Sequence, residues 1–280
     1  MPKAIDIHIH PPNEPGTPED RFTQAMAEYF KSPTEVVTRE GLAEMYQELD
    51  MMAVVLASDA RSAQGDAFDS NDWVASFAQK YPDTFIAFGS VDPWRGKMAV
   101  KEIERAAKEL GVRGIKFLPM TQEFYPNEHR FYPLYEKMVE LGLIAMFHTG
   151  TTAVGARLPG GGGVHLKYTR PIPYIDDIAA DFPELTIIMA HPAFPWQEEQ
   201  LAVMVHKPNV YMDISGWSPK YFSPLLIQYA NTLLQDKVMF GSDYPGLTPQ
   251  RWLKDFEAAP FRDEVRPKIL LENAKRVLKL

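Results

Sequence analysis

Cysteine is absent from this sequence, and that absence restricts its chemistry more than any other feature of its composition. Without thiols the chain forms no disulfide bonds and offers no thiolate nucleophile, so any bound metal must use histidine or carboxylate ligands. Blocks of basic residues are absent as well. The 29 Lys and Arg residues against 37 Asp and Glu residues give a formal net charge of −8. This balance argues against a nucleic-acid partner.

Long hydrophobic stretches are also missing. No run of about 18 apolar residues suggests a membrane span, and the first residues lack the apolar centre of a signal peptide. We therefore expect a soluble, cytoplasmic protein that acts on a small molecule and not at a membrane. No repeat, low-complexity tract or shift in composition marks a second domain, so residues 1–280 are expected to form one domain.

Short apolar runs alternate regularly with longer amphipathic segments along the chain. The runs are nearly continuous in apolar residues, as expected of parallel strands covered on both faces. This alternation predicts an α/β fold, the single-domain (β/α)8 TIM barrel. An open doubly wound sheet is the alternative, but no glycine-rich phosphate loop follows the first strand. Strands are predicted at 4–10, 52–58, 85–91, 114–118, 143–148, 185–191, 209–214 and 238–243, and helices at 39–49, 72–80, 97–110, 132–141, 175–181, 198–205 and 224–234.

Two connections are long for an α/β unit, and both follow strand ends. Residues 11–38 begin with several prolines and contain a predicted helix near 19–31, while residues 149–174 include four consecutive glycines. In barrels, the loops after the carboxyl ends of the strands build the active site. Ordering a glycine run costs conformational entropy. We expect this run to be either a mobile lid over the site or a flexible surface loop.

The first predicted strand ends in a His-x-His pair, His8 and His10. Side chains two residues apart on a strand share one face, so both imidazoles can converge on one metal ion. By itself such a pair is a weak signal. Three further apolar runs end in His148, His191 and Asp243. A hydrogen-bonded core histidine is the simpler explanation for any one of them, but strand ends of a parallel barrel share one rim, and the set favours a metal site.

The motifs DIHIH, FHTG, AHP and GSDYP together resemble those of the amidohydrolase superfamily, in particular its branch related to aminocarboxymuconate-semialdehyde decarboxylase. The resemblance implies that His8, His10, His148 and Asp243 are metal ligands and that His191 is the general acid/base. Relatives are often dimers, so a homodimer is expected. The resemblance covers nearly the whole chain, including segments 114–119 and 125–127 and a final helix at 269–276.

Three histidines and one aspartate suit either zinc or manganese, and zinc is favoured because it suits imidazole-rich sites. Such an ion keeps a position for water, whose pKa falls to about 7 in a catalytic zinc site. His191 has a reference pKa near neutrality, which suits proton transfer. Asp243 is the alternative base if it contacts the metal only weakly.

Lys116 lies in the fourth predicted strand, on the face opposite Ile115 and Phe117, so it is expected to point into the barrel. Binuclear amidohydrolases carry a carbamylated lysine in this strand that bridges two metals. The alternatives are a cationic contact to a substrate carboxylate and a structural ion pair.

Several other residues near strand ends are candidates. Asp213 is expected either to accept a hydrogen bond from a metal-binding histidine or to form a structural hydrogen bond at the barrel rim. Arg61, His165 and Arg170 lie in rim loops and are candidates to bind a carboxylate or phosphate, or are solvated surface. Aromatic residues there suit an aromatic or acyl substrate or pack in the core. They are Trp94, Trp196, Trp217, Tyr125 and Tyr244, with Trp196 favoured, whereas His129 and His206 are interpreted as structural.

Three function classes follow. The preferred one is a metal-dependent hydrolase acting on the carbonyl of a small organic acid or thioester, since the chain looks most like members that cleave a C–C bond of aromatic β-ketoacyl-CoA. The alternative is a metal-dependent non-oxidative decarboxylase of an aromatic or unsaturated acid. Both reactions use the same five residues, so the motifs do not separate them. A non-catalytic binding protein should lack a ligand, and none is missing.

Overall fold

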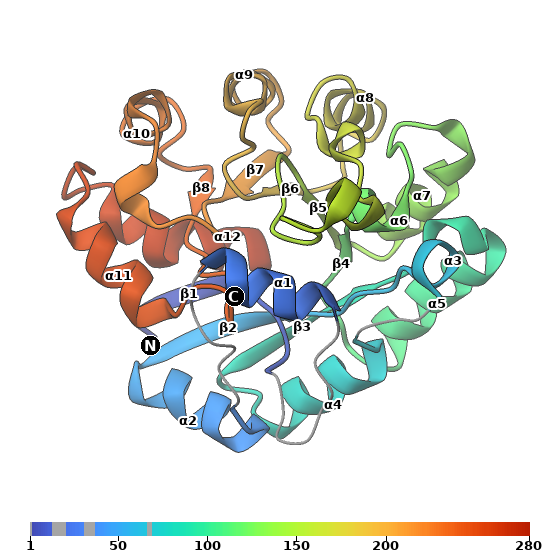
Figure 1. Cartoon of the computed structure of the whole chain (residues 1–280), viewed down its shortest axis with the longest axis horizontal. Helices are drawn as coiled ribbons and strands as arrows, with labels where there is room; N and C mark the ends of the chain where they lie inside the picture. The colour runs from blue at the N-terminus through green and yellow to red at the C-terminus, as the bar shows by residue number, and fades with distance from the viewer. Residues whose placement is uncertain (1, 13–20, 31–36, 66–68) are drawn as a thin grey trace.

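The computed structural model describes residues 2–12, 21–30, 37–65 and 69–280. Eight strands form one sheet in the order β1 to β8, and each strand is parallel to the next. Helices surround this sheet (Figure 1). The strands are β1 (Ala4–Ile9), β2 (Met51–Leu56), β3 (Phe85–Ser90), β4 (Gly114–Phe117), β5 (Ile144–His148), β6 (Ile187–Ala190), β7 (Val210–Asp213) and β8 (Val238–Met239).

Backbone hydrogen bonds join the first strand to the chain around the last one. The amide of Ile7 donates to the carbonyl of Phe240 at 3.1 Å. The amide of Asp243 donates to the carbonyl of His8 at 2.8 Å, and a parallel bridge joins Ile9 to Tyr244. These contacts nearly close the sheet on itself, which confirms the predicted (β/α)8 TIM barrel.

The predicted helices are also present, although α11 (Pro249–Ala258) was not predicted. Those that cover the barrel are α2 (Arg39–Glu48), α4 (Asn71–Lys80), α5 (Lys97–Lys108), α7 (Tyr132–Glu140), α8 (Tyr174–Asp181), α9 (Gln197–His206), α10 (Pro224–Ala230) and α11 (Pro249–Ala258). Shorter or peripheral ones are α1 (Arg21–Phe30), α3 (Arg61–Gln64), α6 (Pro119–Gln122) and α12 (Asn273–Leu278). None of the described helices is long and apolar enough to cross a membrane.

Three predicted boundaries were wrong. The helix predicted at 224–234 ends at Ala230, because the chain then folds into turns in which the amide of Leu234 donates back to Tyr229. The last strand, predicted to reach 243, stops at Met239, and Asp243 has a left-handed backbone that no strand adopts. The final helix begins as π-helix over Lys268–Glu272 before α12. The helix predicted near 19–31 is α1, and its outermost residues lie outside the described part of the chain.

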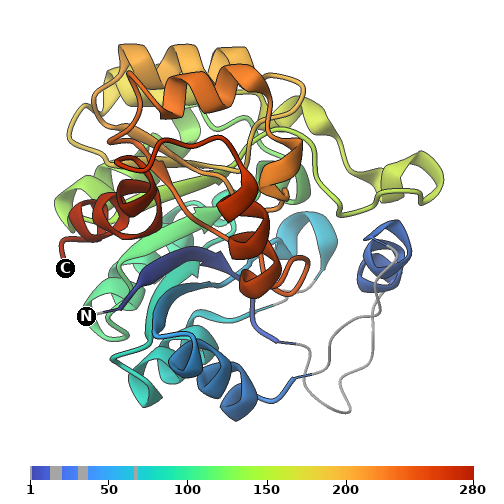
Figure 2. The same ribbon diagram turned by 90° about the vertical axis from the view of Figure 1, so that its left-hand side faces the viewer.

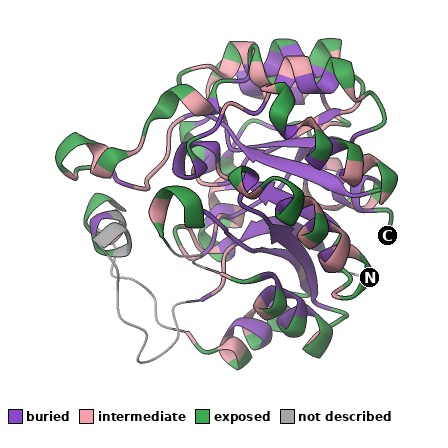
Figure 3. Ribbon diagram, turned by 90° about the vertical axis from the view of Figure 1, so that its right-hand side faces the viewer, coloured by how far each residue is buried: buried purple, intermediate pink, exposed green. Residues whose placement is uncertain are grey.

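The buried apolar residues form two layers. An inner cluster fills the barrel and includes Ile7, Phe88 and Met146, while an outer cluster lies between strands and helices. Figure 3 shows this arrangement, with buried strands at the centre and exposed residues on the outer faces of the helices. The strands are therefore covered on both sides, as their continuous apolar runs predicted.

Trp252 anchors α11 in the outer layer, and its removal is expected to be costly. Its side chain is fully buried, with its ring 4.4 Å from that of Phe240 and 5.0 Å from that of Phe256 between centroids. Trp252→Ala should lower the free energy of unfolding by about 3–5 kcal/mol through lost burial and a residual cavity. Urea denaturation measures this, with Trp94→Ala, on a half-exposed ring, as control. An equal loss in both variants would contradict the assignment.

A register shift between Asp6 and Ile9 interrupts β1 and decides where His8 points. Ile5 and Ile7 pack inside the barrel, whereas Asp6 faces α2 and accepts a hydrogen bond from the Tyr46 hydroxyl at 2.8 Å. Strict alternation would place His8 on the same outer side as Asp6. Since irregularities of this kind re-aim side chains next to active sites, the shift explains how His8 reaches the interior.

The carboxyl ends of the strands open on the side where α1 and the long β5–α8 connection lie (Figure 2). These two segments contact each other through Arg157, whose guanidinium lies 5.7 Å from the centre of the Tyr29 ring. Within the connection, Gly160, Gly161 and Gly162 have φ values of 61°, 65° and 64°. Successive left-handed residues of this kind favour glycine, so the run has a defined turn conformation that other residues would strain.

Candidate active site

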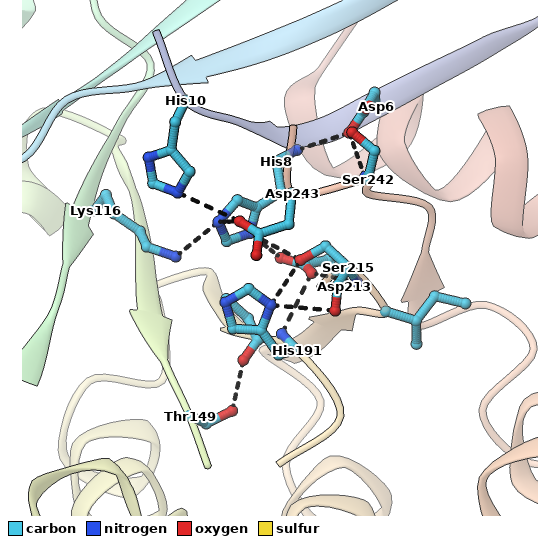
Figure 4. A network of polar contacts seen from close by, with 12 residues as sticks. Asp6, His8, His10, Lys116, Thr149, His191, Asp213, Ser215, Ser242 and Asp243 are labelled. Carbon is cyan, nitrogen blue, oxygen red and sulfur yellow. Dashed lines mark hydrogen bonds and ion pairs between the residues drawn. The ribbon is translucent and has the colours of Figure 1, made fainter. Parts of the chain in front are cut away.

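Polar side chains from four parts of the barrel point toward one another near the carboxyl ends of the strands (Figure 4). His8 lies in β1 and His10 directly after it, Lys116 lies in β4, His191 follows the end of β6, and Asp243 lies in the segment after β8. The fold thus gathers these five sequence-predicted residues around one point.

His8, His10 and Asp243 converge most closely. Oδ1 of Asp243 lies 3.3 Å from Nε2 of His8 and 3.4 Å from Nε2 of His10. One potential ligand atom from each of the three residues lies within 4.8 Å of the others. The Asp243 side chain is 27 % exposed, whereas the His8 side chain is fully buried, so the group is open on one side only.

Asp213 fixes the tautomer of His8. Its Oδ2 lies 3.0 Å from Nδ1 of His8, and because a carboxylate only accepts, Nδ1 carries the proton and Nε2 keeps a lone pair. Burial acts to raise the pKa of Asp213, but His8 and the hydrogen bond from it hold that pKa below its ordinary value. Burial lowers the pKa of His8 to about 3, and positive Lys116 adds to this, so His8 is neutral at pH 7. This is the arrangement expected of a metal-binding histidine with a supporting carboxylate.

Ser215 fixes the tautomer of His191. Nδ1 of His191 lies 3.2 Å from the carbonyl oxygen of Ser215 and 2.9 Å from its hydroxyl. A carbonyl only accepts, so Nδ1 carries the proton and Nε2 is the atom left to take up or deliver another. Burial lowers the pKa of His191, while negative Asp243 and Asp213 oppose that effect.

The two residues that end these strand segments have unusual backbones. His191 has φ 70° and Asp243 has φ 66°, both in the left-handed region that costs energy for most residues. Gly216 makes room for them, since a Cβ there would lie 2.9 Å from Nδ1 of His191 and 3.1 Å from Oδ2 of Asp243. Strain and close packing at this point are typical of functional sites.

Asp6 lies next to the cluster and joins β1 to the segment after β8 by hydrogen bonds. Its Oδ1 accepts hydrogen bonds from the amides of His8 at 3.2 Å and Ser242 at 2.8 Å, which ties β1 to the segment that carries Asp243. Burial raises the pKa of Asp6 to about 7, and the hydrogen bonds from Ser242 and Tyr46 oppose that rise. Asp6 therefore positions two of the converging residues without facing the cavity.

His148 is placed near the cluster but does not belong to its converging group. Its ring centre lies 4.6 Å from that of His191, and its Nε2 lies 3.1 Å from the carbonyl oxygen of Thr151. That bond assigns the proton to Nε2 and leaves the lone pair on Nδ1. Burial lowers the pKa of His148 well below its ordinary value, and His191 and Lys116 add to the effect.

Lys116 points into the barrel, as its position in the strand predicted. Its side chain is fully buried and its Nζ lies 3.3 Å from Nε2 of His8. Burial lowers the pKa of Lys116 to about 8, although negative Asp213 and Asp243 act to raise it. The residue therefore remains a cation at pH 7 beside the converging group.

The predicted rim cations already have partners. Arg61 pairs with Asp59 through Nη2 and Oδ2 at 2.6 Å, and Arg170 pairs with Glu199 at 2.5 Å. His165 is exposed, with its ring 6.4 Å from that of Tyr168. Within the described chain, these contacts of the three residues all lie outside the histidine cluster.

The predicted aromatic residues are spread around the rim. Trp196 is partly exposed at the start of α9, and Trp217 lies 6.1 Å from Phe194 between ring centres. Tyr244 is buried in the outer core and Trp94 stacks edge-on against Phe131. Tyr125 joins Tyr168 and Tyr174 in an aromatic group at the base of the β5–α8 connection. Of the two histidines interpreted as structural, His129 stacks on Tyr132 and His206 is exposed at the end of α9.

Sequence reasoning missed Asp6, Ser215 and Gly216. A charged residue inside the apolar run before His8 was the available signal for Asp6. Ser215 and Gly216 follow Asp213 in the short segment Asp213-Ile-Ser-Gly, but nothing in that segment indicates which histidine it faces. The parallel pairing of β6 with β7 brings it beside His191.

A sequence model of the amidohydrolase family, described as "Amidohydrolase", matches residues 5–280. The chain belongs to the amidohydrolase family. This confirms the resemblance drawn from the four motifs, and it makes the protein an amidohydrolase-fold enzyme in which His8, His10 and Asp243 are placed so that they could hold a metal ion.

Two curated relatives of this amidohydrolase catalyse different reactions. Gamma-resorcylate decarboxylase from Polaromonas sp. strain JS666 is 22% identical over 282 residues, covering 88% of this chain and 86% of the relative. A 2-keto-4-carboxy-3-hexenedioate hydratase from Sphingobium sp. strain SYK-6 is 25% identical over 248 residues, covering 74% and 69%. Neither is named as a hydrolase.

Among solved structures, 5-carboxyvanillate decarboxylase from Novosphingobium aromaticivorans superimposes with a TM-score of 0.66. The two proteins are 20% identical, and the match covers 99% of this chain and 96% of the other. At that identity the likeness shows the shared barrel fold. That structure contains manganese and 4-hydroxy-3-methoxy-5-nitrobenzoic acid.

The donor set of this amidohydrolase fits a divalent metal. The converging group offers imidazole nitrogens from His8 and His10 and a carboxylate oxygen from Asp243, which are ligands that zinc and manganese accept. The lone pair of His8 is directed away from Asp213 and toward this group. A second possible group, His8 with His191 and Asp213, contains two residues, His8 and Asp213, whose side chains already hydrogen-bond each other, so the first group fits better.

Proposed function

We propose that this protein is a metal-dependent decarboxylase of a small aromatic or unsaturated carboxylic acid. The observation that carries the choice of reaction is the similarity to gamma-resorcylate decarboxylase over 88% of the chain. The resemblance to particular family members favoured hydrolysis of an organic acid or thioester, but the named relatives support the decarboxylase alternative better. The geometry around His191 supplies the groups that such a reaction needs.

His8, His10, His148 and Asp243 are proposed as the metal ligands. The first, second and fourth converge, and His148 would turn its Nδ1 lone pair toward the same ion. Manganese is now preferred to zinc, because a related decarboxylase structure contains it and because carboxylate-bearing sites accept it. When bound, the metal supplies electrostatic stabilisation of negative charge on a substrate oxygen.

His191 is proposed to move the proton. Its Nδ1 is engaged by Ser215, so Nε2 is the atom that delivers a proton to the substrate carbon. As CO₂ leaves, the electrons of the broken C–C bond remain on that carbon and form the new C–H bond. Negative Asp213 and Asp243 nearby stabilise the charged imidazolium before transfer. Asp243 remains the alternative proton donor.

Substrate contacts are proposed for Lys116 in the barrel and, at the rim, for Trp196. Arg61, His165 and Arg170 would contribute only if the substrate reaches the rim, and the two arginines would have to share their carboxylate partners with it. The geometry therefore favours a small substrate held near Lys116 over one with a long anionic extension.

Metal content and CO₂ release test the proposed function together. Protein purified with manganese should bind about one equivalent per chain, measured by elemental mass spectrometry, and His148→Ala should bind less. The loaded protein should release CO₂ from hydroxylated benzoates, and the release should stop with a chelator and return with manganese. His165→Ala serves as a matched control.

Two results would contradict the proposal. Full activity in metal-stripped protein would exclude metal catalysis. The second is hydrolysis of β-ketoacyl thioesters, or hydration of an unsaturated acid, with no CO₂ release from any acid tested. The protein would then catalyse another reaction of the family.

A further inference from the structure

The ammonium of Lys116 competes with the proposed metal for one lone pair. Nζ of Lys116 lies 3.3 Å from Nε2 of His8, which is the nitrogen that would bind the metal. Nδ1 of His8 is already engaged by Asp213 at 3.0 Å, so no second lone pair is available on that ring. A metal that takes Nε2 therefore removes the hydrogen-bond acceptor of Lys116.

Lys116 has no other hydrogen-bond acceptor among the residues that the structure describes. Among the described residues, no carboxylate lies within ion-pair distance of its Nζ, and His8 is its one hydrogen-bond partner. Its side chain is fully buried, so bulk solvent does not reach the ammonium. A buried ammonium without an anion or acceptor costs several kcal/mol in general, and native proteins pair such groups.

The charges of the site lead to the same conclusion. Two carboxylates, Asp213 and Asp243, and one ammonium, Lys116, lie in this cluster. With a divalent ion the buried site carries one positive charge in excess. A ligand with a single negative charge restores neutrality and supplies the oxygen atoms that Lys116 lacks.

We propose that Lys116 binds the carboxylate of the substrate beside the metal and thereby selects monoanionic carboxylic acids. This role rests on the proposed function, because it requires a metal at His8. Nζ of Lys116 donates to a carboxylate oxygen of the bound acid. Since the departing CO₂ is neutral, this contact weakens as the reaction proceeds, so Lys116 contributes more to binding than to the chemical step.

Calorimetry on wild type, Lys116→Met and Lys116→Arg tests this role. First, Mn²⁺ is titrated into metal-free protein. Lys116→Met should bind Mn²⁺ at least as tightly as wild type, because the competing cation near His8 is gone. Second, 2,6-dihydroxybenzoate and its carboxamide are titrated into manganese-loaded protein. Wild type should prefer the carboxylate by about tenfold or more, and Lys116→Met should lose that preference, which Lys116→Arg should partly restore.

Kinetics and a control complete the design. In Lys116→Met, the KM for an acid that the enzyme decarboxylates should rise by about tenfold or more, while kcat changes less. Lys80→Met, which removes an exposed ion pair with Glu40, should match wild type in every measurement. If Lys116 only supported the barrel, its substitution would lower the affinity for the metal and the affinity for the carboxylate together.

The outcomes separate the two proposals. Weaker Mn²⁺ binding in Lys116→Met, or an unchanged carboxylate preference, would overturn the role of Lys116. The mass of carbon dioxide added to Lys116 together with two bound Mn²⁺ would also overturn it, in favour of a bridging carbamate. Failure of wild type to bind Mn²⁺ at all would overturn the proposed function itself.

Discussion

Asp243→Asn should reduce turnover by at least about 10³-fold while the protein stays folded. The carboxylate oxygen of Asp243 lies 3.3–3.4 Å from Nε2 of both His8 and His10, and an amide cannot supply its charge. Asparagine has the same shape and tolerates the left-handed backbone that this position requires, with φ 66°. The loss should therefore reflect the charge and not the backbone.

Turnover and metal affinity measure this effect, with circular dichroism as a check on folding. Asp50→Asn is a matched control, because Asp50 also has a left-handed backbone, with φ 54°, and lies before β2 at the opposite end of the barrel. It should leave turnover unchanged. Normal turnover in Asp243→Asn would exclude Asp243 from both the metal group and proton transfer.

His191→Asn should lower kcat by about 10²–10⁴-fold and leave metal binding nearly intact. Nδ1 of His191 is held by Ser215, so its free Nε2 is the proton carrier, whereas the converging group consists of His8, His10 and Asp243. Asparagine again suits the left-handed backbone, with φ 70°.

The pH dependence of kcat and the metal content distinguish this role from that of a ligand. Wild type should show a pH limb that His191→Asn lacks, and both should bind equal metal. His206→Asn, on an exposed histidine at the end of α9, is the control. Loss of metal in His191→Asn would make His191 a ligand and leave proton transfer to Asp243.

The barrel could be predicted from sequence because its signal is repeated. Each strand is an apolar run of similar length, and each was found within a few residues of its predicted place. The helix α11 was missed, although Thr248 caps it, Pro249 begins it, and Trp252 and Phe256 share one face. The helix predicted at 224–234 was too long, because the apolar residue Leu234 continues the helical pattern after the helix has ended.

The site was less predictable than the fold. Strand ends identified His8, His10, His191 and Asp243, because parallel strands share one rim. Asp6, Ser215 and Gly216 contact these residues only because of the register shift in β1 and the left-handed backbone of several residues. Neither feature has a local sequence signal. The choice of reaction depends on pocket contacts that the motifs do not encode.

The place where the barrel closes is also the place where its polar cluster forms. Asp6 and Ser242 are separated by 236 positions in the chain, yet a hydrogen bond of 2.8 Å joins them, and the carbonyl of His8 bonds the amide of Asp243 in the same seam. Contacts between the two ends of a chain carry the largest loop-closure entropy, so they form late in folding. A metal held by His8 and Asp243 would cross-link the first and last strands, and ion binding would then stabilise the closed barrel against opening.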